Sequence, residues 1–545
     1  MEKLLSRYFL ILIIGFYSRT LLSQSEQVFI NQDFEYRYQS LLSGKNVKSH
    51  GAIKPYVYSD FDQIGLNSDS SILYNSGFPM SKMKKEKEVH NARMSFFPLV
   101  NMGFGVANGE SLKTYSDLGI GASALFEYKK VFAARINFSG HKNEFPGYLE
   151  QKVREKRITP DGYVWDTYSN GYNYTNLNGY LSWNAGKYFN LQLGRGKNFI
   201  GSGYRSLLLS DNAGNYNYGR IMASIWRLKY VVIYAHQKDI NSSESKHSGQ
   251  WKNKYSTTHY LSWNVAKWLN IGLFESVVWK AQDTLLNRGY DVNYLNPVLF
   301  FRPAEYSTGS SDNSLIGVNL SIKPSNKIQV YGQFILDEFL LDEFKKDVKE
   351  IGSPGSQPQF GWWANKYGGQ FGFKTFDVFG LKGMGIQAEY NFSRPFTYSH
   401  ADPIQNYGHQ NSSLAHPLGS NFNEVIGFVN FQRKNWFAQI QVAWYNQGLS
   451  TDSVNFGENI YLPYTSRKGD YGHTIAQGVQ NDVINIGGRV SYLIYPRNNL
   501  RTFIGIRNRM IGIRNRMQNL GGLKSGTMFF EFGISTSMFN RYTDI

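Results

Sequence analysis

From Arg93 onward, apolar and polar positions alternate along the chain with a period of two. Within residues 117–128, the apolar set alternates with glycine, serine and glutamate, and it comprises Leu118, Ile120, Ala122, Ala124, Phe126 and Tyr128. Successive side chains of a strand point to opposite faces, so these strands have one apolar and one polar face. The pattern is typical of a membrane barrel with lipid outside and a polar lumen, although a soluble β-sandwich also alternates.

The lengths of the connections favour the barrel over the sandwich. We predict about eighteen strands, at 93–107, 117–128, 131–140, 176–186, 188–196, 219–227, 228–237, 257–266, 268–279, 314–323, 327–337, 366–376, 382–394, 423–433, 436–446, 482–494, 500–508 and 526–538. Short turns such as Lys129-Lys130 and Lys434-Asn435 alternate with long connections at 141–175, 197–218, 238–256, 280–313, 338–365, 395–422 and 447–481. Bacterial outer-membrane barrels have an even strand number, with short turns on one rim and long loops on the other.

The N-terminus has the pattern of an export signal. Lys3 and Arg7 precede the apolar run Tyr8–Tyr17, which is too short to span a bilayer, and cleavage near Ser23 fits. The alternative, a retained membrane anchor, is less favoured by this length. We predict a signal peptide at 1–23, an N-terminal periplasmic segment at 24–92 and an outer-membrane barrel at 93–545.

The N-terminal periplasmic segment is polar and irregular, and residues 31–43 predict a short amphipathic helix. We expect the segment to pack against or inside the barrel mouth, with a mobile leader as the alternative. The predicted fold class is therefore all-β, a transmembrane antiparallel β-barrel of about 18 strands with a small, partly helical N-terminal periplasmic segment.

Composition agrees with export to a Gram-negative outer membrane. The 545 residues include 38 Tyr, 38 Phe and 11 Trp but no Cys, which excludes disulfides and cysteine zinc sites. Mean hydropathy is −0.41, unlike that of a helical membrane protein. The net charge of +17 comes from scattered lysines and arginines without a nucleic-acid-binding motif. We expect lipopolysaccharide or an acidic glycan as partner, and no nucleic acid.

Two internal repeats add detail to the barrel. Tyr180–Leu193 and Tyr260–Leu273 each predict a strand, a short turn and a second strand. Their aromatic residues at the turn, which we expect to form an interfacial girdle, are Trp183, Tyr188, Trp263 and Trp268. The heptapeptide Ile504–Met510 recurs directly as Ile511–Met517, and an odd repeat reverses the facing of a strand beyond it. We expect one copy to lie in the last outer loop.

The stretch Gly194–Arg220 is the first candidate for function. It is rich in Gly, Asn and Ser, yet it connects two predicted strands, and glycines allow close backbone approach to a ligand. Tyrosine rings stack on sugars, while Asp, Asn and Arg bond hydroxyl and acid groups. The equally weighted alternative is an ordered plug loop whose polar groups bond one another. Residues of this region that we predict to bind a glycan or partner are Arg195, Lys197, Tyr204, Arg205, Asp211 and Asn212.

The second candidate is the loop 280–313, where Arg302, Glu305 and Asp312 predict a salt-bridge network. The pairs Asp211-Asn212 and Asp312-Asn313 lie on the same predicted rim, so a shared site is an additional hypothesis. The residues of this loop that we predict to bind a glycan or partner are Arg302, Glu305, Asp312 and Asn313. Such a network more often shapes a loop than binds a ligand.

Residues 336–350 predict a small lid helix, and their acids lack the spacing of a calcium loop. Glycines at 194, 196 and 201 approach a nucleotide-binding pattern without the required helix. No histidine pair has metal-ligand spacing, and no nucleophile elbow occurs. We therefore predict no catalytic residue, no cofactor and no metal, and hence no enzyme.

Several segments together resemble the capsule-assembly Wzi family of outer-membrane proteins. These are Gly194-Arg195, Gly201–Gly203 and Ser206–Ala213. The segments Asn296–Asn319, Leu336–Phe339 and Gly361–Gly369 look most like the branch that includes the gliding-motility protein RemB. The resemblance implies an outer-membrane barrel whose loops interact with surface polysaccharide, supporting capsule attachment in one branch and motility in the other.

The leading hypothesis is an outer-membrane barrel that organises the cell surface. It supports gliding motility or the attachment and assembly of surface polysaccharide through its extracellular loops, with polysaccharide or a motility adhesin as partner. The alternative is an outer-membrane transport channel, and the weakest hypothesis is a barrel hydrolase.

Overall fold

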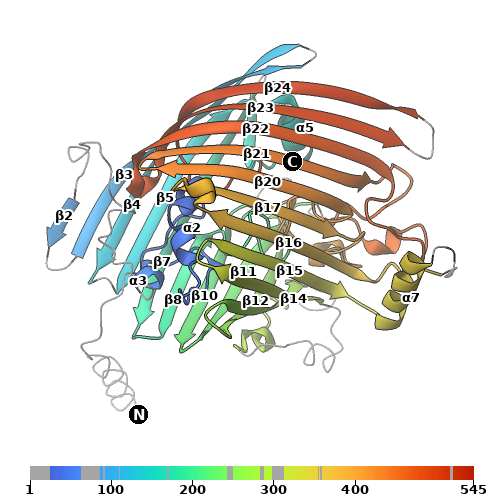
Figure 1. Ribbon diagram of the computed structural model, residues 1–545, viewed down its shortest axis with the longest axis horizontal. Helices are drawn as coiled ribbons and strands as arrows, with labels where there is room; N and C mark the ends of the chain where they lie inside the picture. The colour runs from blue at the N-terminus through green and yellow to red at the C-terminus, as the bar shows by residue number, and fades with distance from the viewer. Residues whose placement is uncertain are drawn as a thin grey trace.

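The computed structural model describes residues 25–62, 86–89, 92–109, 111–129, 131–168, 171–241, 250–282, 288–297, 312–353, 355, 359–515 and 520–545. The predicted signal peptide, residues 1–23, lies outside them. Eighteen antiparallel strands close into one barrel (Figure 1). They are β3 (Ala92–Asn108), β4 (Leu112–Tyr128), β5 (Phe132–Asn143), β7 (Gly171–Ala185), β8 (Phe189–Gly196), β10 (Tyr216–Ile225), β11 (Leu228–Asp239), β12 (Lys252–Asn264), β13 (Leu269–Lys280), β14 (Asn313–Ser325), β15 (Ile328–Glu338), β16 (Lys366–Phe376), β17 (Met384–Ser393), β20 (Phe422–Arg433), β21 (Trp436–Leu449), β22 (Val479–Tyr495), β23 (Leu500–Asn515) and β24 (Leu520–Thr536).

The predicted barrel class and strand number are confirmed, and each predicted strand overlaps one strand of the wall. The ring closes where β24 pairs with β3, in the register Met528↔Asn108 to Ser535↔Asn101. Two further strands extend hairpins at the rims: β2 (Glu86–Val89) pairs with β3, and β6 (Val164–Tyr168) pairs with β7.

Alternation places the apolar residues outside. In β3, Phe96 and Phe104 are half-exposed, while the intervening Phe97 and Asn101 are buried. The four predicted girdle residues are 44–48% exposed at the short-turn rim, where wall side chains meet the membrane–water interface. None of the described helices is long and apolar enough to cross a membrane.

The hairpin repeat gives the same inward hydrogen bonds twice. Asn190 Nδ2 donates to Ser182 Oγ at 3.0 Å and to Asn184 Oδ1 at 2.7 Å. In the second copy, Asn270 Nδ2 donates to the equivalent serine and asparagine, at 2.9 Å each. The sequence similarity therefore reflects a repeated lumen-facing polar network.

The heptapeptide repeat lies mostly in a strand, so our prediction of one copy in the outer loop is wrong. β23 contains the whole first copy and continues to Asn515, because its pairing with β22 runs on to Gln480↔Arg514. Because seven is odd, the equivalent isoleucines of the two copies face opposite sides of the wall, as predicted. Ile504 and Ile506 are about half exposed on the outside, whereas Ile511 packs against the interior cluster.

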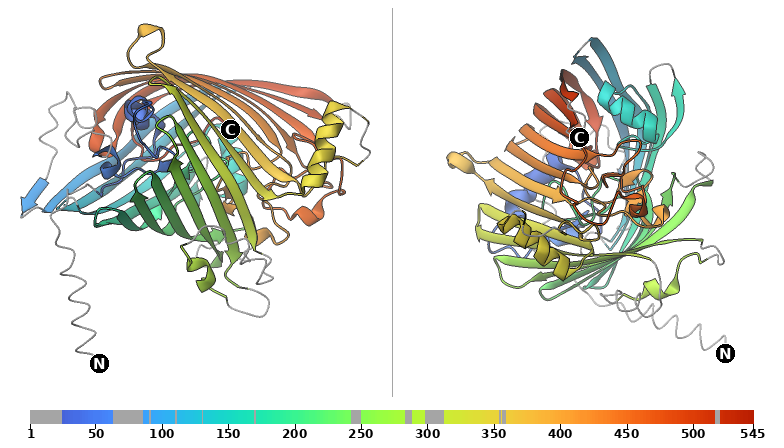
Figure 2. Two further views of the ribbon diagram at one scale, coloured as in Figure 1. Left: turned by 60° about the horizontal axis from the view of Figure 1, so that its bottom comes forward. Right: turned by 90° about the vertical axis from the view of Figure 1, so that its right-hand side faces the viewer.

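The lumen is filled by four segments, residues 25–62, 197–215, 394–421 and 537–545, which we call the plug. The predicted N-terminal helix is present as α2 (Gln32–Leu42), capped by the Asn31 side chain, and a short helix α3 (Tyr58–Asp62) follows. Figure 2 shows α2 enclosed by the strands. β1 (Ile53–Lys54) pairs with β9 (Phe199–Ile200), and β18 (Gly408–His409) with β19 (Ser412–Ser413), so plug segments pair with one another and within themselves.

One large hydrophobic cluster contains residues of both the plug and the wall. From the plug it contains Ile53, Leu207, Leu208, Tyr398 and Leu414, and from the wall it contains residues of β10–β15 and β20–β22. Wall lysines hold the N-terminal segment: Lys323 Nζ donates to Leu42 O at 2.8 Å, and Lys229 Nζ lies 2.6 Å from Asp60 Oδ1. The plug is thus packed like a protein core against the barrel.

Two helices stand in the loops of the other rim. α5 (Gly147–Lys156) follows β5, and α7 (Leu341–Gly352) connects β15 with β16. The helix predicted within residues 336–350 is therefore confirmed. Its predicted place as a lid is wrong, because Phe344 of the helix and Phe339 just before it contact the outward side of the wall at Tyr367.

Candidate functional site

The loop 197–215 folds into the lumen instead of standing on the rim as a free loop. Leu207 and Leu208 are fully buried, and Gly203 lies against the wall. A Cβ at Gly203 would approach Glu389 Oε1 to 2.8 Å, so this close approach requires glycine. The alternative of an ordered plug loop describes the geometry of this segment.

Arg205 is the centre of the loop's attachment. It is fully buried, and its Nη2 lies 3.0 Å from Glu424 Oε1 on β20 and 2.9 Å from Asp544 Oδ2. Burial alone would lower the pKa of the Arg205 guanidinium, but the carboxylates of Asp544 and Glu424 raise it well above its usual value. Glu389 on β17 accepts the backbone N–H groups of Tyr204 and Arg205. Two wall carboxylates therefore hold the loop.

His416 completes this buried cluster. Leu418 N donates to His416 Nδ1 at 3.2 Å, so that nitrogen carries no proton, and Nε2 lies 2.8 Å from Glu424 Oε2. Burial lowers the pKa of His416, which agrees with a neutral ring that donates from Nε2.

Lys197 and Asp211 are also turned inward. Lys197 Nζ donates to the Asp211 carbonyl at 2.9 Å, and Tyr542 donates to Asp211 Oδ1 at 2.5 Å. Burial lowers the pKa of Lys197 and raises that of Asp211. Arg195 remains half-buried on β8 and donates to Asn217 at 3.2 Å.

The second candidate loop is held in a similar way. Arg288 binds the Asp312 carboxylate through two bonds of 2.8 Å, and Asn313 Nδ2 donates to Gln405 O at 2.9 Å. Arg302 and Glu305 lie outside the described residues, so their predicted network with Asp312 stays a prediction.

The two Asp-Asn pairs do not meet within the described structure, but both contact the plug segment 394–421. Asn212 Nδ2 donates to Ser413 O at 3.0 Å, whereas Asn313 and Asp312 bond Gln405. A shared ligand site at these pairs is not supported by this arrangement. Their proposed role in binding a glycan or partner stays a prediction.

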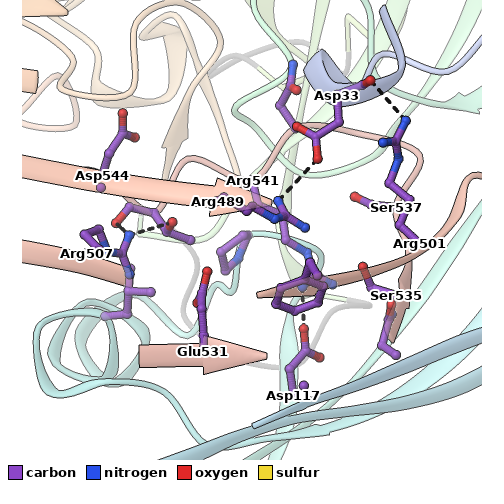
Figure 3. Close-up of a pocket in the computed structure, with 18 of the residues that line it drawn as sticks. Asp33, Asp117, Arg489, Arg501, Arg507, Glu531, Ser535, Ser537, Arg541 and Asp544 are labelled. Carbon is purple, nitrogen blue, oxygen red and sulfur yellow. Dashed lines mark hydrogen bonds and ion pairs between the residues drawn. The ribbon is translucent and has the colours of Figure 1, made fainter. Parts of the chain in front are cut away.

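A cavity of about 260 Å³ lies between the plug and the wall strands β22, β23, β24, β3 and β4 (Figure 3). It extends from Asn499 near the short turns to Phe145 and Asp161 in the loop of α5. Its charged residues are Asp33, Asp117, Glu144, Asp161, Arg489, Arg501, Arg507, Glu531, Arg541 and Asp544.

Most of these charges are paired. Arg541 contacts Asp117 and lies 2.6 Å from Asp161, and Arg489 lies 3.5 Å from Asp33. Within the described residues Glu531 has no hydrogen-bond partner, but its carboxylate interacts electrostatically with the guanidinium of Arg507 (Figure 3). The cavity wall thus carries both acidic and basic groups, which act as oriented hydrogen-bond donors and acceptors, and not charges of one sign only.

Aromatic rings and amides complete the cavity wall. The rings are Tyr115, Phe145, Tyr204 and Phe503, and the amides include Asn101, Asn143, Gln439 and Gln441. A polyhydroxylated ligand needs this combination, because its hydroxyls donate and accept while its C–H faces pack on rings. The chemistry of the cavity therefore suits a polyhydroxylated ligand. Within the described residues, no group of three His, Cys, Asp or Glu could hold a metal.

Of the ten residues predicted from the sequence, eight are described by the structure, and among these eight only Tyr204 lines this cavity. The arginines of β23 were not singled out, although a signal existed. Arg507 alternates with the outward Ile504 and Ile506, so the period of two alone places its side chain in the lumen.

The closed 18-strand barrel, with its apolar outer face and polar lumen, is an outer-membrane β-barrel. Among solved structures, it is similar to Wzi, an outer membrane protein involved in group 1 capsule assembly in Escherichia coli and described as a carbohydrate-binding β-barrel. The alignment has a TM-score of 0.51 at 12% identity and covers 93% of this chain and 99% of Wzi. The similarity establishes a shared fold.

Two further matches are weaker. OccK8 (OprE) of Pseudomonas aeruginosa gives a TM-score of 0.41 at 8% identity, covering 82% of this chain and 98% of OccK8. OccAB2 of Acinetobacter baumannii gives 0.39 at 9% identity, covering 80% and 97%. No protein-family model and no curated protein sequence matches the chain. The resemblance to the RemB branch and the link to gliding stay predictions.

Proposed function

We propose that this protein is an occluded outer-membrane barrel that binds surface polysaccharide and retains it at the cell. The observation that carries the proposal is the plug. Four segments share one hydrophobic cluster with the wall and occupy the lumen, which leaves binding rather than passage as the function the interior supports. This geometry weighs against the alternative of a transport channel.

The cavity supports a carbohydrate as the ligand. Its paired charges, amides and rings match the chemistry of a hydroxylated chain. The fold similarity to Wzi, itself described as a carbohydrate-binding barrel, agrees with this choice of ligand.

Binding is tested on purified protein in nanodiscs, with polysaccharide extracted from the same cells and followed by biolayer interferometry. We expect Tyr115→Ala and Glu531→Gln to weaken binding, because both side chains line the cavity. Matched controls are Tyr128→Ala, on the outer face of the same strand, and Glu155→Gln, on the exposed side of α5. Unchanged binding by both cavity variants would place the ligand elsewhere, and no binding by the wild type would contradict the proposal.

A clean gene deletion tests the role in the cell. We expect polysaccharide to be released into the medium, and complementation with the cavity variants to restore retention poorly. Normal retention together with lost colony spreading would contradict the retention role and would support the motility hypothesis with an adhesin as partner.

A further inference from the structure

Helix α7 packs against the outside of the barrel at the long-loop rim, beside the ends of β15 and β16 (Figures 1 and 2). The ring of Phe344 lies 5.9 Å from Tyr367, which in turn lies 5.8 Å from Phe334. Phe334 is 40% exposed on the lipid-facing side of β15. Phe371, four residues after Tyr367 on the same face of β16, is 60% exposed. The helix therefore continues the outward apolar surface of the wall.

A second contact, at a position adjacent to Phe344 on the helix surface, fixes the orientation of α7 about its axis. Asp347 is buried, accepts from Gly361 N at 2.6 Å and lies 3.4 Å from Arg394 Nη1. Leu341 and Val348, three residues before and four residues after Phe344, lie beside it on the side away from Asp347, and these side chains are 58% and 51% exposed. The chain thus exposes an apolar helix edge in line with its lipid-facing surface.

Lysines border this edge. Lys345 and Lys349 follow Leu341 and Val348 on the adjoining helix face, and Lys345 also pairs with Asp342 at 2.8 Å. Long lysine side chains at such positions keep their charge in the headgroup region while their stems lie on apolar surface. Large exposed apolar residues rimmed by polar ones indicate an interaction surface.

We propose that α7 is an interfacial helix that lies in the outer leaflet of the membrane, with Leu341 and Val348 among the lipid acyl chains. The occupant is lipid, because the exposed edge is continuous through Tyr367 with the lipid-facing wall. An amphipathic helix in this position binds in the plane of the interface with its apolar side inserted. It would fix the height and tilt of the barrel at the rim that carries the long loops. This inference is independent of the ligand of the cavity.

The absence of cysteine from the chain makes the test direct, since one introduced cysteine carries one probe. Val348→Cys and Leu341→Cys are labelled with an environment-sensitive fluorophore, and the full-length protein is reconstituted into bilayers with and without acyl-chain spin-labelled lipid. Phe371→Cys, on the wall, is the control in lipid, and Asp342→Cys, whose side chain is 88% exposed, is the control in water.

We expect probes at 348 and 341 to be quenched to at least half the extent seen at 371, and the probe at 342 to be quenched little. Quenching at 348 and 341 no greater than at 342 would overturn the proposal. Because the bilayer contains only this protein and lipid, a bound partner protein cannot produce the expected result. Heat-modifiable gel mobility confirms that each labelled barrel is folded.

Discussion

The barrel wall and the plug differ in how far apart in sequence their contacting segments are. The wall is made of consecutive antiparallel neighbours, so nearly all of its pairings join strands that are adjacent in sequence. The plug is made of segments far apart in sequence, and the bond between Arg205 and Asp544 joins positions 339 residues apart. The wall is specified by a local alternation of side chains, whereas the plug is specified by long-range polar pairs and one shared cluster.

Because of this difference, the two regions should respond differently to substitution. A wall residue that faces lipid contributes through one strand, and its loss leaves the closed ring intact. A plug residue connects several segments at once, so its loss frees neighbours that are buried and charged. Substitutions in the two regions should therefore differ in size, and the following predictions run from the largest expected effect to the smallest.

Arg205→Met should have the largest effect. It leaves Glu424 and Asp544 buried without their cation, and removing one partner of a buried ion pair costs about 3–5 kcal/mol. The free energy is measured by urea unfolding of the refolded barrel, followed by heat-modifiable mobility. Arg195→Met, which loses a single bond to Asn217, is the matched control. A loss at position 205 as small as that at position 195 would contradict the role of Arg205 as the plug's main attachment.

Leu208→Ala should follow, with a loss of about 2–5 kcal/mol, because Leu208 is fully buried in the shared cluster. Leu193→Ala removes the same atoms from a side chain that is 65% exposed on the outer face of β8. The same unfolding experiment should show little change for Leu193→Ala. Equal losses at the two positions would mean that the plug is not packed as a core.

Acidification should loosen the plug at His409. Burial lowers the pKa of His409 to about 3, below its ordinary value of 6.5, and Nδ1 accepts from Lys238 N at 3.0 Å. A histidine with a depressed folded pKa stabilises the fold fully above pH 6.5, and this contribution is lost as the pH falls from 6.5 towards 3. Proteolytic sensitivity of the plug measured across this range should rise. In His409→Asn, whose side-chain amide keeps the acceptor without titrating, the pH dependence should be smaller, and an unchanged profile would refute the assignment.

The repeated hairpins give the smallest and most closely matched comparison. Asn190→Ala and Asn270→Ala each remove a donor from a buried serine and a buried asparagine, which costs about 1–3 kcal/mol. Because the direct asparagine bonds have similar geometry in the two copies, the losses measured by unfolding should agree within about 0.5 kcal/mol. A clear inequality would show that the additional contacts of the copies matter, since Gln192 bonds Ser182 in the first copy and His50 bonds Ser262 in the second.

The sequence predicts the wall well because its determinants are local. Alternation and turn length located the eighteen strands that close the barrel, and the error at the heptapeptide repeat arose because pairing with β22 continued into the second copy. The interior was less predictable. The inward turn of the loop at Gly203 depends on Glu389 and Glu424, which alternation places in the lumen but does not match to a partner. The cavity depends on three plug segments, 25–62, 197–215 and 537–545, meeting the wall, and no local pattern specifies that.

The most direct test of the occluded barrel is single-channel conductance in planar bilayers. The wild type should show no steady open state, because the plug fills the lumen, while Arg205→Met should show intermittent opening as its loop detaches. A steady, ohmic conductance from the wild-type protein would contradict the account and would establish the channel in place of the binding barrel.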